Sequence, residues 1–386
     1  MVPNNRMLRE EFCLSYRDNF LEFAGDLSCA RLFVVDDYSP CFDENCKVLE
    51  KCGLPYEYWS IRSQIDFFRK NFDGRWERYW SIIPHRTDAS RSFGYLVAAR
   101  WGADVIITID DDNYAVGKST GLDYDYLGSH DVVNSEREIA EVHSTSRWFN
   151  PISMLMTKPD KDLYARGYPY SRRFGELNYH ICKGRIAMNV GLWTGVPDVD
   201  SLSVLAEGSL NGLPKTRVLG FRSGLNRLAI GKGTLAPLNT ANTAYSRKLL
   251  PIIYDTFQGA QIGELRLDRF GDIWCNLVVK KILDQTGDRI CVGMPLVEHR
   301  REPRSTFDDF RKEFWGIVVS ERVFDFIERL DLQSRSYGNL YQEIVESLRG
   351  EFLRQLDDLR CLHEYFGKLF ASMLGWLDVV EQLGLA

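Results

Sequence analysis

The chain has 386 residues, of which 45% are apolar, enough to bury one large α/β domain with an appendage or two ordinary domains. Its 48 Lys and Arg residues against 54 Asp and Glu give a formal net charge of −6, which offers no overall attraction to nucleic acid or to an anionic membrane. No run of about 18 apolar residues and no charged-then-apolar leader occurs, and the nine cysteines include no Cys-x-x-Cys pair. We therefore expect a cytoplasmic protein with free thiols, no nucleic-acid partner and no membrane span.

The first predicted strand ends in two carboxylates. Residues 31–37 are a short apolar, β-branched stretch that closes with Asp36 and Asp37 and runs into Ser39-Pro40, the pattern of a buried strand entering a loop. Such an acidic strand end suits the base or ribose of a nucleotide, although a simple strand-terminating turn explains it equally well. Apolar side chains at helical spacing then predict a helix over residues 60–72.

A second helix and strand lead to the most acidic turn of the chain. Helical spacing over 89–101 continues through Gly102 into residues 104–109, an apolar run typical of a strand buried on both faces. Strand, helix and strand in succession predict a parallel α/β sheet, in which ligands bind beyond the carboxyl ends of the strands. The triplet Asp110 to Asp112 lies at that end.

Three consecutive aspartates are also typical of a solvated turn or a helix cap, but a buried strand directly before them favours a metal site. Mg²⁺ and Mn²⁺ prefer carboxylate and phosphate oxygens and keep positions open for a substrate. In an extended turn, residues i and i+2 point the same way, so Asp110 and Asp112 can share one cation while Asp111 faces elsewhere. His299 is the best-placed further ligand and would favour Mn²⁺, although a structural role is common for a single histidine.

The remainder of the chain changes character twice. Residues 115–250 are rich in Gly, Pro, Tyr and Asn, and we expect long loops and a few short strands there, forming an acceptor pocket. A helix over 272–283 and a strand over 290–297 follow. Beyond residue 320, apolar side chains recur at three- and four-residue steps, which predicts a helical extension at 321–386 attached to a domain at 1–320. Its apolar stripe would pack on that domain or join a homodimer.

Several strings, in this order along the chain, resemble the reversibly glycosylated polypeptide family, whose plant members are UDP-arabinopyranose mutases. The most specific is Arg-Gly-Tyr-Pro-Tyr-Ser-Arg-Arg, which begins at Arg166. The resemblance spans most of the first 320 residues and implies the GT-A fold of glycosyltransferases, with a mostly parallel central sheet. The matching segments are 2–6, 32–37, 91–95, 108–112, 166–173, 191–200, 232–242, 269–274 and 295–299.

The resemblance also implies roles for individual residues. Arg166 matches the position that family members glycosylate reversibly, and Arg173 matches a supporting arginine. Asp272 matches an acidic residue that can act as general base, with a helix N-cap as the alternative. A divalent cation, Mn²⁺ or Mg²⁺, would be held by Asp110, Asp112 and His299. The residues expected to contact the nucleotide sugar are Pro3, Asn5, Arg6, Asp36, Asp37, Arg91, Tyr95, Asp110, Asp111 and Lys232.

Departures from the family bear on the reaction. Gly271 replaces an aspartate, Glu298 replaces a tryptophan, and neither residues 113–160 nor the segment beyond 320 resembles the plant proteins. A changed acceptor side favours a metal-dependent glycosyltransferase that moves sugar from a UDP-sugar to a small-molecule or protein acceptor. A UDP-sugar mutase is the close alternative; a non-catalytic GT-A scaffold and a magnesium phosphotransferase are more distant. Since the family's first strand would precede Val2, we also expect an in-frame extension upstream of Met1.

Overall fold

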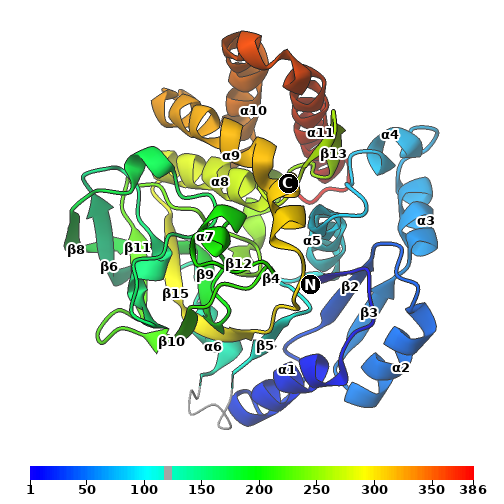
Figure 1. Cartoon of the computed structure of the whole chain (residues 1–386). Helices are drawn as coiled ribbons and strands as arrows, with labels where there is room; N and C mark the ends of the chain where they lie inside the picture. Colours follow the sequence, from blue (N-terminus) through cyan, green and yellow to red (C-terminus); the bar gives the residue numbers. More distant parts are fainter. Residues whose placement is uncertain (117–123) are drawn as a thin grey trace.

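Three parallel strands form the N-terminal sheet of the computed structural model, which describes residues 1–116 and 124–386. Their order is β1 (Val2–Asn4), β2 (Leu32–Asp36) and β3 (Tyr56–Trp59), with Asn4 in register with Asp36. These strands alternate with α1 (Glu10–Phe23), α2 (Phe42–Cys52) and α3 (Ile61–Asn71), all drawn in blue in Figure 1. The predicted strand at 31–37 and the predicted helix at 60–72 are therefore confirmed.

A second sheet of ten strands lies beside the first (Figure 1), and one continuous hydrophobic core includes residues of both sheets and of the C-terminal helices. Its main path, in spatial order, is β4 (Val105–Ile109), β12 (Asn242–Ser246), β9 (Ile186–Gly195), β15 (Arg289–His299), β11 (Arg227–Ile230), β6 (Arg137–Ser144) and β8 (Leu177–Gly184). Three short strands complete the sheet. β5 (Asn113–Ala115) pairs with β15, β10 (Arg217–Phe221) pairs with β9, and β7 (Leu155–Lys158) pairs with the other edge of β10.

The larger sheet is mixed, so the expectation of a mostly parallel central sheet is wrong for it. Among the described residues, parallel pairing in this sheet is confined to β9 with β15 and β11 with β6. The strand–helix–strand pattern that suggested parallel pairing ends at β4. The strands of the next 140 residues follow one another without the long crossover helices that parallel neighbours need, and they pair mainly antiparallel.

The expectation of long loops and a few short strands over 115–250 is wrong for three strands, because β6, β8 and β9 are 8, 8 and 10 residues long. The apolar run of β9 is interrupted by Asn189 and Gly191, which hid the strand in the sequence. Both residues are required by close packing: Asn189 donates to the carbonyl of Met294 at 2.9 Å, and a Cβ at Gly191 would lie 2.5 Å from the carbonyl oxygen of Pro295.

The two sheets meet at the first residue of the chain. The amino group of Met1 donates to the carbonyl of Ile107 at 2.7 Å, and the amide of Ile109 donates to the carbonyl of Met1 at 3.0 Å. An apolar cavity of about 670 Å³ lies next to this junction, between β2 and β4. The predicted upstream extension is not tested by these contacts and stays a prediction.

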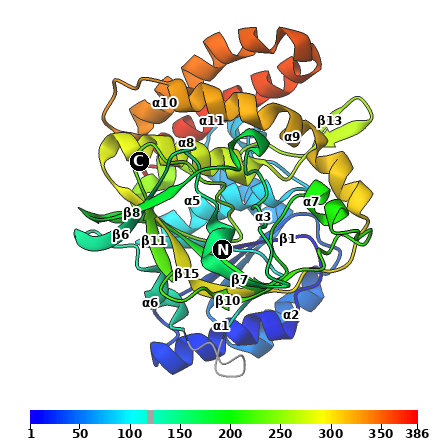
Figure 2. The same cartoon turned by 60° about the vertical axis from the view of Figure 1, so that its left-hand side comes forward.

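The C-terminal segment is helical, as predicted, and covers α8 (Gly271–Thr286), as Figure 2 shows. It comprises α9 (Thr306–Arg329), α10 (Tyr337–Ser347), two irregular turns at Leu348–Phe352 and Leu353–Leu362, and α11 (His363–Gln382). Shorter helices elsewhere are α4 (Trp76–Trp80), α6 (Tyr126–His130) and α7 (Ser201–Ala206), and α5 (Arg91–Trp101) precedes β4.

The apolar stripe of this segment packs against the rest of the chain. The indole of Trp376 donates to the carbonyl of Leu250 at 2.9 Å, and the ring of Phe366 stacks on Trp274 of α8 with centroids 5.9 Å apart. This packing removes the reason to expect a homodimer through the stripe. Among the described residues, no helix has both the length and the apolar character that crossing a bilayer requires.

A matched pair of glycines tests whether α9 packs against Phe270, the residue before α8. A Cβ at Gly316 of α9 would lie 2.2 Å from the ring of Phe270, whereas a Cβ at Gly367 of α11 would meet no atom within 4 Å. Gly316→Ala should lower the free energy of unfolding by about 1–3 kcal/mol through overpacking. Gly367→Ala should raise it by about 0.5–1 kcal/mol through helix propensity. Urea unfolding of both variants checks this, and equal stabilisation would show that α9 is not packed against Phe270.

Candidate active site

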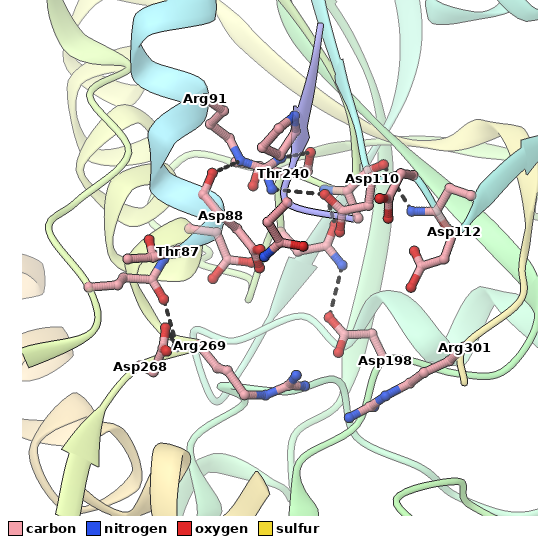
Figure 3. A pocket seen from close by; sticks show the side chains of 18 of the residues that line it. Thr87, Asp88, Arg91, Asp110, Asp112, Asp198, Thr240, Asp268, Arg269 and Arg301 are labelled. Carbon is pink, nitrogen blue, oxygen red and sulfur yellow. Dashed lines mark hydrogen bonds and ion pairs between the residues drawn. The ribbon is translucent and has the colours of Figure 1, made fainter. Parts of the chain in front are cut away.

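A polar cavity of about 340 Å³ opens at the ends of β1 and β4, within the size range of small-molecule sites (Figure 3). Its wall is crowded with charged side chains of both signs. The acidic ones are Asp37, Asp88, Asp110, Asp111, Asp112, Asp198, Asp268 and Asp272. The basic ones are Arg6, Arg86, Arg91, Arg166, Arg266, Arg269, Arg301, Arg304 and Lys312. A polar ligand with anionic groups fits such a lining better than an apolar one.

Arg91 anchors the first aspartate of the acidic turn. It is the first residue of α5, and its buried guanidinium donates to Asp110 Oδ1 at 2.8 Å, to Thr108 Oγ1 at 2.8 Å and to the carbonyl of Thr240 at 2.9 Å. Burial raises the pKa of the Asp110 carboxyl to about 7, although the Arg91 charge opposes this. Arg91 therefore fixes the direction of this carboxylate within the cavity.

The other two aspartates of the turn have different partners. Arg6 Nε donates to Asp111 Oδ2 at 2.9 Å, so Asp111 is held against the end of β1. Asp112 Oδ2 lies 3.8 Å from His299 Nε2, at the end of β15. The Nδ1 of His299 lies 2.7 Å from the carbonyl of Val196, which favours the tautomer that donates from Nδ1 and leaves Nε2 as an acceptor.

This arrangement bears on the predicted metal. A carboxylate and an imidazole nitrogen side by side are a donor set that suits Mn²⁺, and Asp110 supplies a second carboxylate on the same cavity wall. Within residues 1–116 and 124–386, no cluster of three or more His, Cys, Asp or Glu side chains is already arranged around a cation position. Diphosphate oxygens would have to complete the coordination, and the metal stays a prediction.

Arg166 is clamped between two carboxylates in the opposite part of the cavity. Its Nε and Nη2 donate to both oxygens of Asp198 at 3.0 Å, and its Nη1 and Nη2 donate to those of Asp272 at 3.1 and 2.8 Å. Burial lowers the pKa of Arg166, but the two carboxylates outweigh it and hold the pKa well above its ordinary value. Burial likewise raises the pKa of Asp198, but Arg166 and its other partners outweigh it and leave the pKa well below its usual range. The guanidinium is fixed in place and permanently charged.

The main role that the structure gives Asp272 is its ion pair with Arg166. It lies in the first turn of α8, where the helix dipole favours a carboxylate, and the N-cap position is taken by Phe270. The N-cap alternative is therefore wrong. Because both oxygens of Asp272 accept hydrogen bonds from Arg166, a general-base role would compete with the ion pair.

Arg269 completes the support of Arg166 through its backbone. Its φ is +65°, a left-handed conformation that costs a non-glycine residue free energy. Its carbonyl accepts a hydrogen bond from Arg166 Nη1, and its amide donates to Gln258 Oε1 at 2.6 Å. The strained turn before α8 thus directs a carbonyl at the guanidinium.

The structure gathers most of the predicted residues at this cavity and leaves four outside its lining. Those that line it are Pro3, Asn5, Arg6, Asp37, Arg91, Asp110, Asp111, Asp112, Arg166, Asp272 and His299. Asp36 accepts a hydrogen bond from the Tyr58 hydroxyl at 3.0 Å instead. Tyr95 is fully buried, Arg173 lies over the ring of Tyr170 at 3.8 Å, and Lys232 is exposed in a loop. The roles of all these residues stay predictions.

Several lining residues escaped the sequence analysis. Asp198 and Arg269 belong to the family-like segments, and Arg301 follows His299 by two positions, so their signals were present in the sequence. Asp88 and Lys312 carried no such signal, because the short 3-10 helix before α5 and the helix α9 bring them to the cavity only in the folded chain.

Comparison with known proteins places these residues in a family context. The sequence model described as reversibly glycosylated polypeptide matches residues 51–384. The chain is 25% identical over 243 residues to probable UDP-arabinopyranose mutase 5 of Arabidopsis thaliana, covering 63% of this chain and 62% of that protein. It is 24% identical over 247 residues to probable inactive UDP-arabinopyranose mutase 2 of Oryza sativa subsp. japonica, covering 64% and 63%. The matched region thus spans somewhat less than two-thirds of each relative.

Proposed function

Because this chain belongs to the reversibly glycosylated polypeptide family, we propose that it is a UDP-sugar mutase that binds its substrate in the cavity between Asp110 and Arg166. The two relatives are named as probable UDP-arabinopyranose mutases, one of them inactive, which supports this reaction. The GT-A fold and the two-part division at residue 320 belong to the same proposal.

The observation that carries the proposal is the position of Arg166. The residue that resembles the family's glycosylated arginine lines the same cavity as the acidic turn, so a sugar that leaves the nucleotide there meets a group of the protein itself. The bond from the anomeric carbon to the β-phosphate oxygen would break as a bond to an Arg166 nitrogen forms. That nitrogen would pass the proton of its hydrogen bond to Asp198 or Asp272, so the glycosylated guanidinium keeps its positive charge, and the proton returns in the reverse step. On this nitrogen the ring can open and close through another hydroxyl, and return to the β-phosphate oxygen restores the UDP-sugar.

A divalent cation would be held by Asp110, Asp112 and His299. When bound there, it would neutralise charge on the diphosphate as the glycosyl bond breaks. The chain's own contribution is to fix two of these side chains: Asp110 through Arg91, and His299 through its hydrogen bond with the carbonyl of Val196.

Transfer to a small-molecule or protein acceptor is the second candidate, and Gly271 favours it. A Cβ at Gly271 would lie 2.5 Å from Gln258 Nε2 and 2.6 Å from the carbonyl oxygen of Thr256. The aspartate of the family therefore does not fit here, and Gln258 lines the cavity. The cavity wall at Gly271 and Gln258 therefore differs from the family pattern, and we propose that an acceptor approaches there.

Product analysis separates the candidates. The protein is incubated with UDP-arabinose, UDP-xylose, UDP-glucose or UDP-galactose and Mn²⁺, and the nucleotides are separated by chromatography. The proposal predicts a ring-isomerised UDP-sugar without net release of UDP. Free UDP with a glycosylated product would favour the transferase. No conversion of any donor, despite UDP binding, would contradict both and favour the scaffold.

A further inference from the structure

The wall of the cavity that faces the acidic turn carries positive charge. Figure 3 shows Arg269 and Arg301 across the pocket from Asp110 and Arg91, with the two guanidinium groups directed toward each other. Lys312 of α9 lines the same cavity, and its ammonium forms no ion pair within the part of the chain that the structure describes.

The carboxylates behind this wall do not match its cations in number. Arg269 Nε donates to Glu313 Oε1 at 2.7 Å. Arg301 and Arg304 share a single carboxylate, that of Asp309, at 2.5 and 2.7 Å. These three guanidinium groups form their ion pairs with two carboxylates, before Lys312 is added. The further carboxylate near them, that of Asp198, is already paired with Arg166.

One N–H group of the Arg301 guanidinium has no hydrogen-bond partner among the described residues. The side chain is only 6% exposed, and the N–H group in question is that of Nε. A buried donor without a partner is destabilising, and like charges that face each other add to that cost. An anion that enters the cavity relieves both.

We infer that Arg301, with Arg269 and Lys312, forms an oxyanion subsite that holds the β-phosphate of the bound nucleotide. The inference rests on the proposed function. A guanidinium donates to two phosphate oxygens at once, which suits Arg301 and Arg269. The position along the chain agrees: Arg301 follows the end of β15 directly after His299, so the same strand end would present the metal ligand and the phosphate clamp.

The supporting helix explains why the subsite is rigid. Asp309 and Glu313 lie on the first turns of α9 at four-residue spacing and therefore on one face of the helix, and Lys312 lines the cavity beside them. Asp309 and Glu313 hold the two arginines from behind, and Lys312 approaches the anion directly. The cationic wall would bind the terminal phosphate, and the rest of the cavity would contact the base and the ribose.

The test compares UDP with UMP, which lacks the β-phosphate. Calorimetry gives the ratio of the two affinities for the wild type, Arg301→Gln, Lys312→Gln and the control Arg311→Gln, which alters an exposed arginine of α9 outside the lining. Loss of a charge-assisted hydrogen bond should reduce the UDP-to-UMP ratio by roughly 10- to 100-fold in Arg301→Gln. Lys312→Gln should reduce it several-fold, and UMP affinity and Arg311→Gln should match the wild type.

The outcomes are distinguishable. Should Arg301→Gln unfold, Lys312→Gln, which breaks no ion pair, still decides the question. A ratio unchanged in both variants would overturn the inference and point to a phosphate carried by an acceptor. Equal affinity of the wild type for UDP and UMP would overturn it while leaving nucleotide binding intact. Binding of neither nucleotide would contradict the proposed function itself.

Discussion

Replacing Arg166 with lysine should slow ring isomerisation of the UDP-sugar by about 100- to 1000-fold, because lysine keeps the charge but loses the fixed guanidinium nitrogen that receives the sugar. Lysine cannot donate in parallel to Asp198 and Asp272 as the guanidinium does. Initial rates of product formation measure the effect. Arg172→Lys is the matched control, because Arg172 is an exposed neighbour whose partner is Asp325. A wild-type rate in Arg166→Lys would contradict the role given to this residue.

Arg166→Ala tests the same clamp through stability. Removing one partner leaves two carboxylates uncompensated, which should lower the free energy of unfolding by about 3–5 kcal/mol at neutral pH. The wild-type pKa of Asp198 is held below its ordinary value, so its stabilising contribution is present above about pH 4 and lost as the pH falls further. The deficit of the variant should therefore shrink as the pH is lowered through about 4. A deficit independent of pH would contradict the ion-pair explanation.

Asp112→Asn should weaken Mn²⁺-dependent UDP binding by about 100-fold or more, because an amide oxygen is a poorer ligand than a carboxylate for a hard cation. Calorimetry with and without Mn²⁺ measures this. Asp66→Asn, on the exposed face of α3, serves as the control. Unchanged Mn²⁺-dependent affinity in Asp112→Asn would show that the acidic turn does not hold the metal.

The elements that could be predicted from the sequence are those specified by local pattern. The strand before Asp110, the helix over Arg91 to Trp101 and the C-terminal helices all carry continuous apolar runs or helical spacing. The strands of residues 115–250 could not be recognised in this way. Their core positions include buried polar and glycine residues such as Asn189 and Gly191, whose presence makes sense only beside β12 and β15.

Site residues could likewise be predicted only where a local pattern marks them. The acidic turn, Arg166 and His299 could be located because short strings mark them. The pairing of Arg166 with Asp272 joins residues 106 positions apart, and the cationic wall depends on α9, so neither could be seen in the sequence. Lys232 and Asp36 belong to family-like segments, but neither side chain lines the cavity in the folded chain.

A crystal structure of the protein soaked with UDP and Mn²⁺ tests the central claim most directly. The account predicts the cation between Asp112 and His299, with the diphosphate spanning the cavity from the acidic turn to Arg301. Nucleotide bound elsewhere on the molecule, or an empty cavity at saturating UDP, would contradict it.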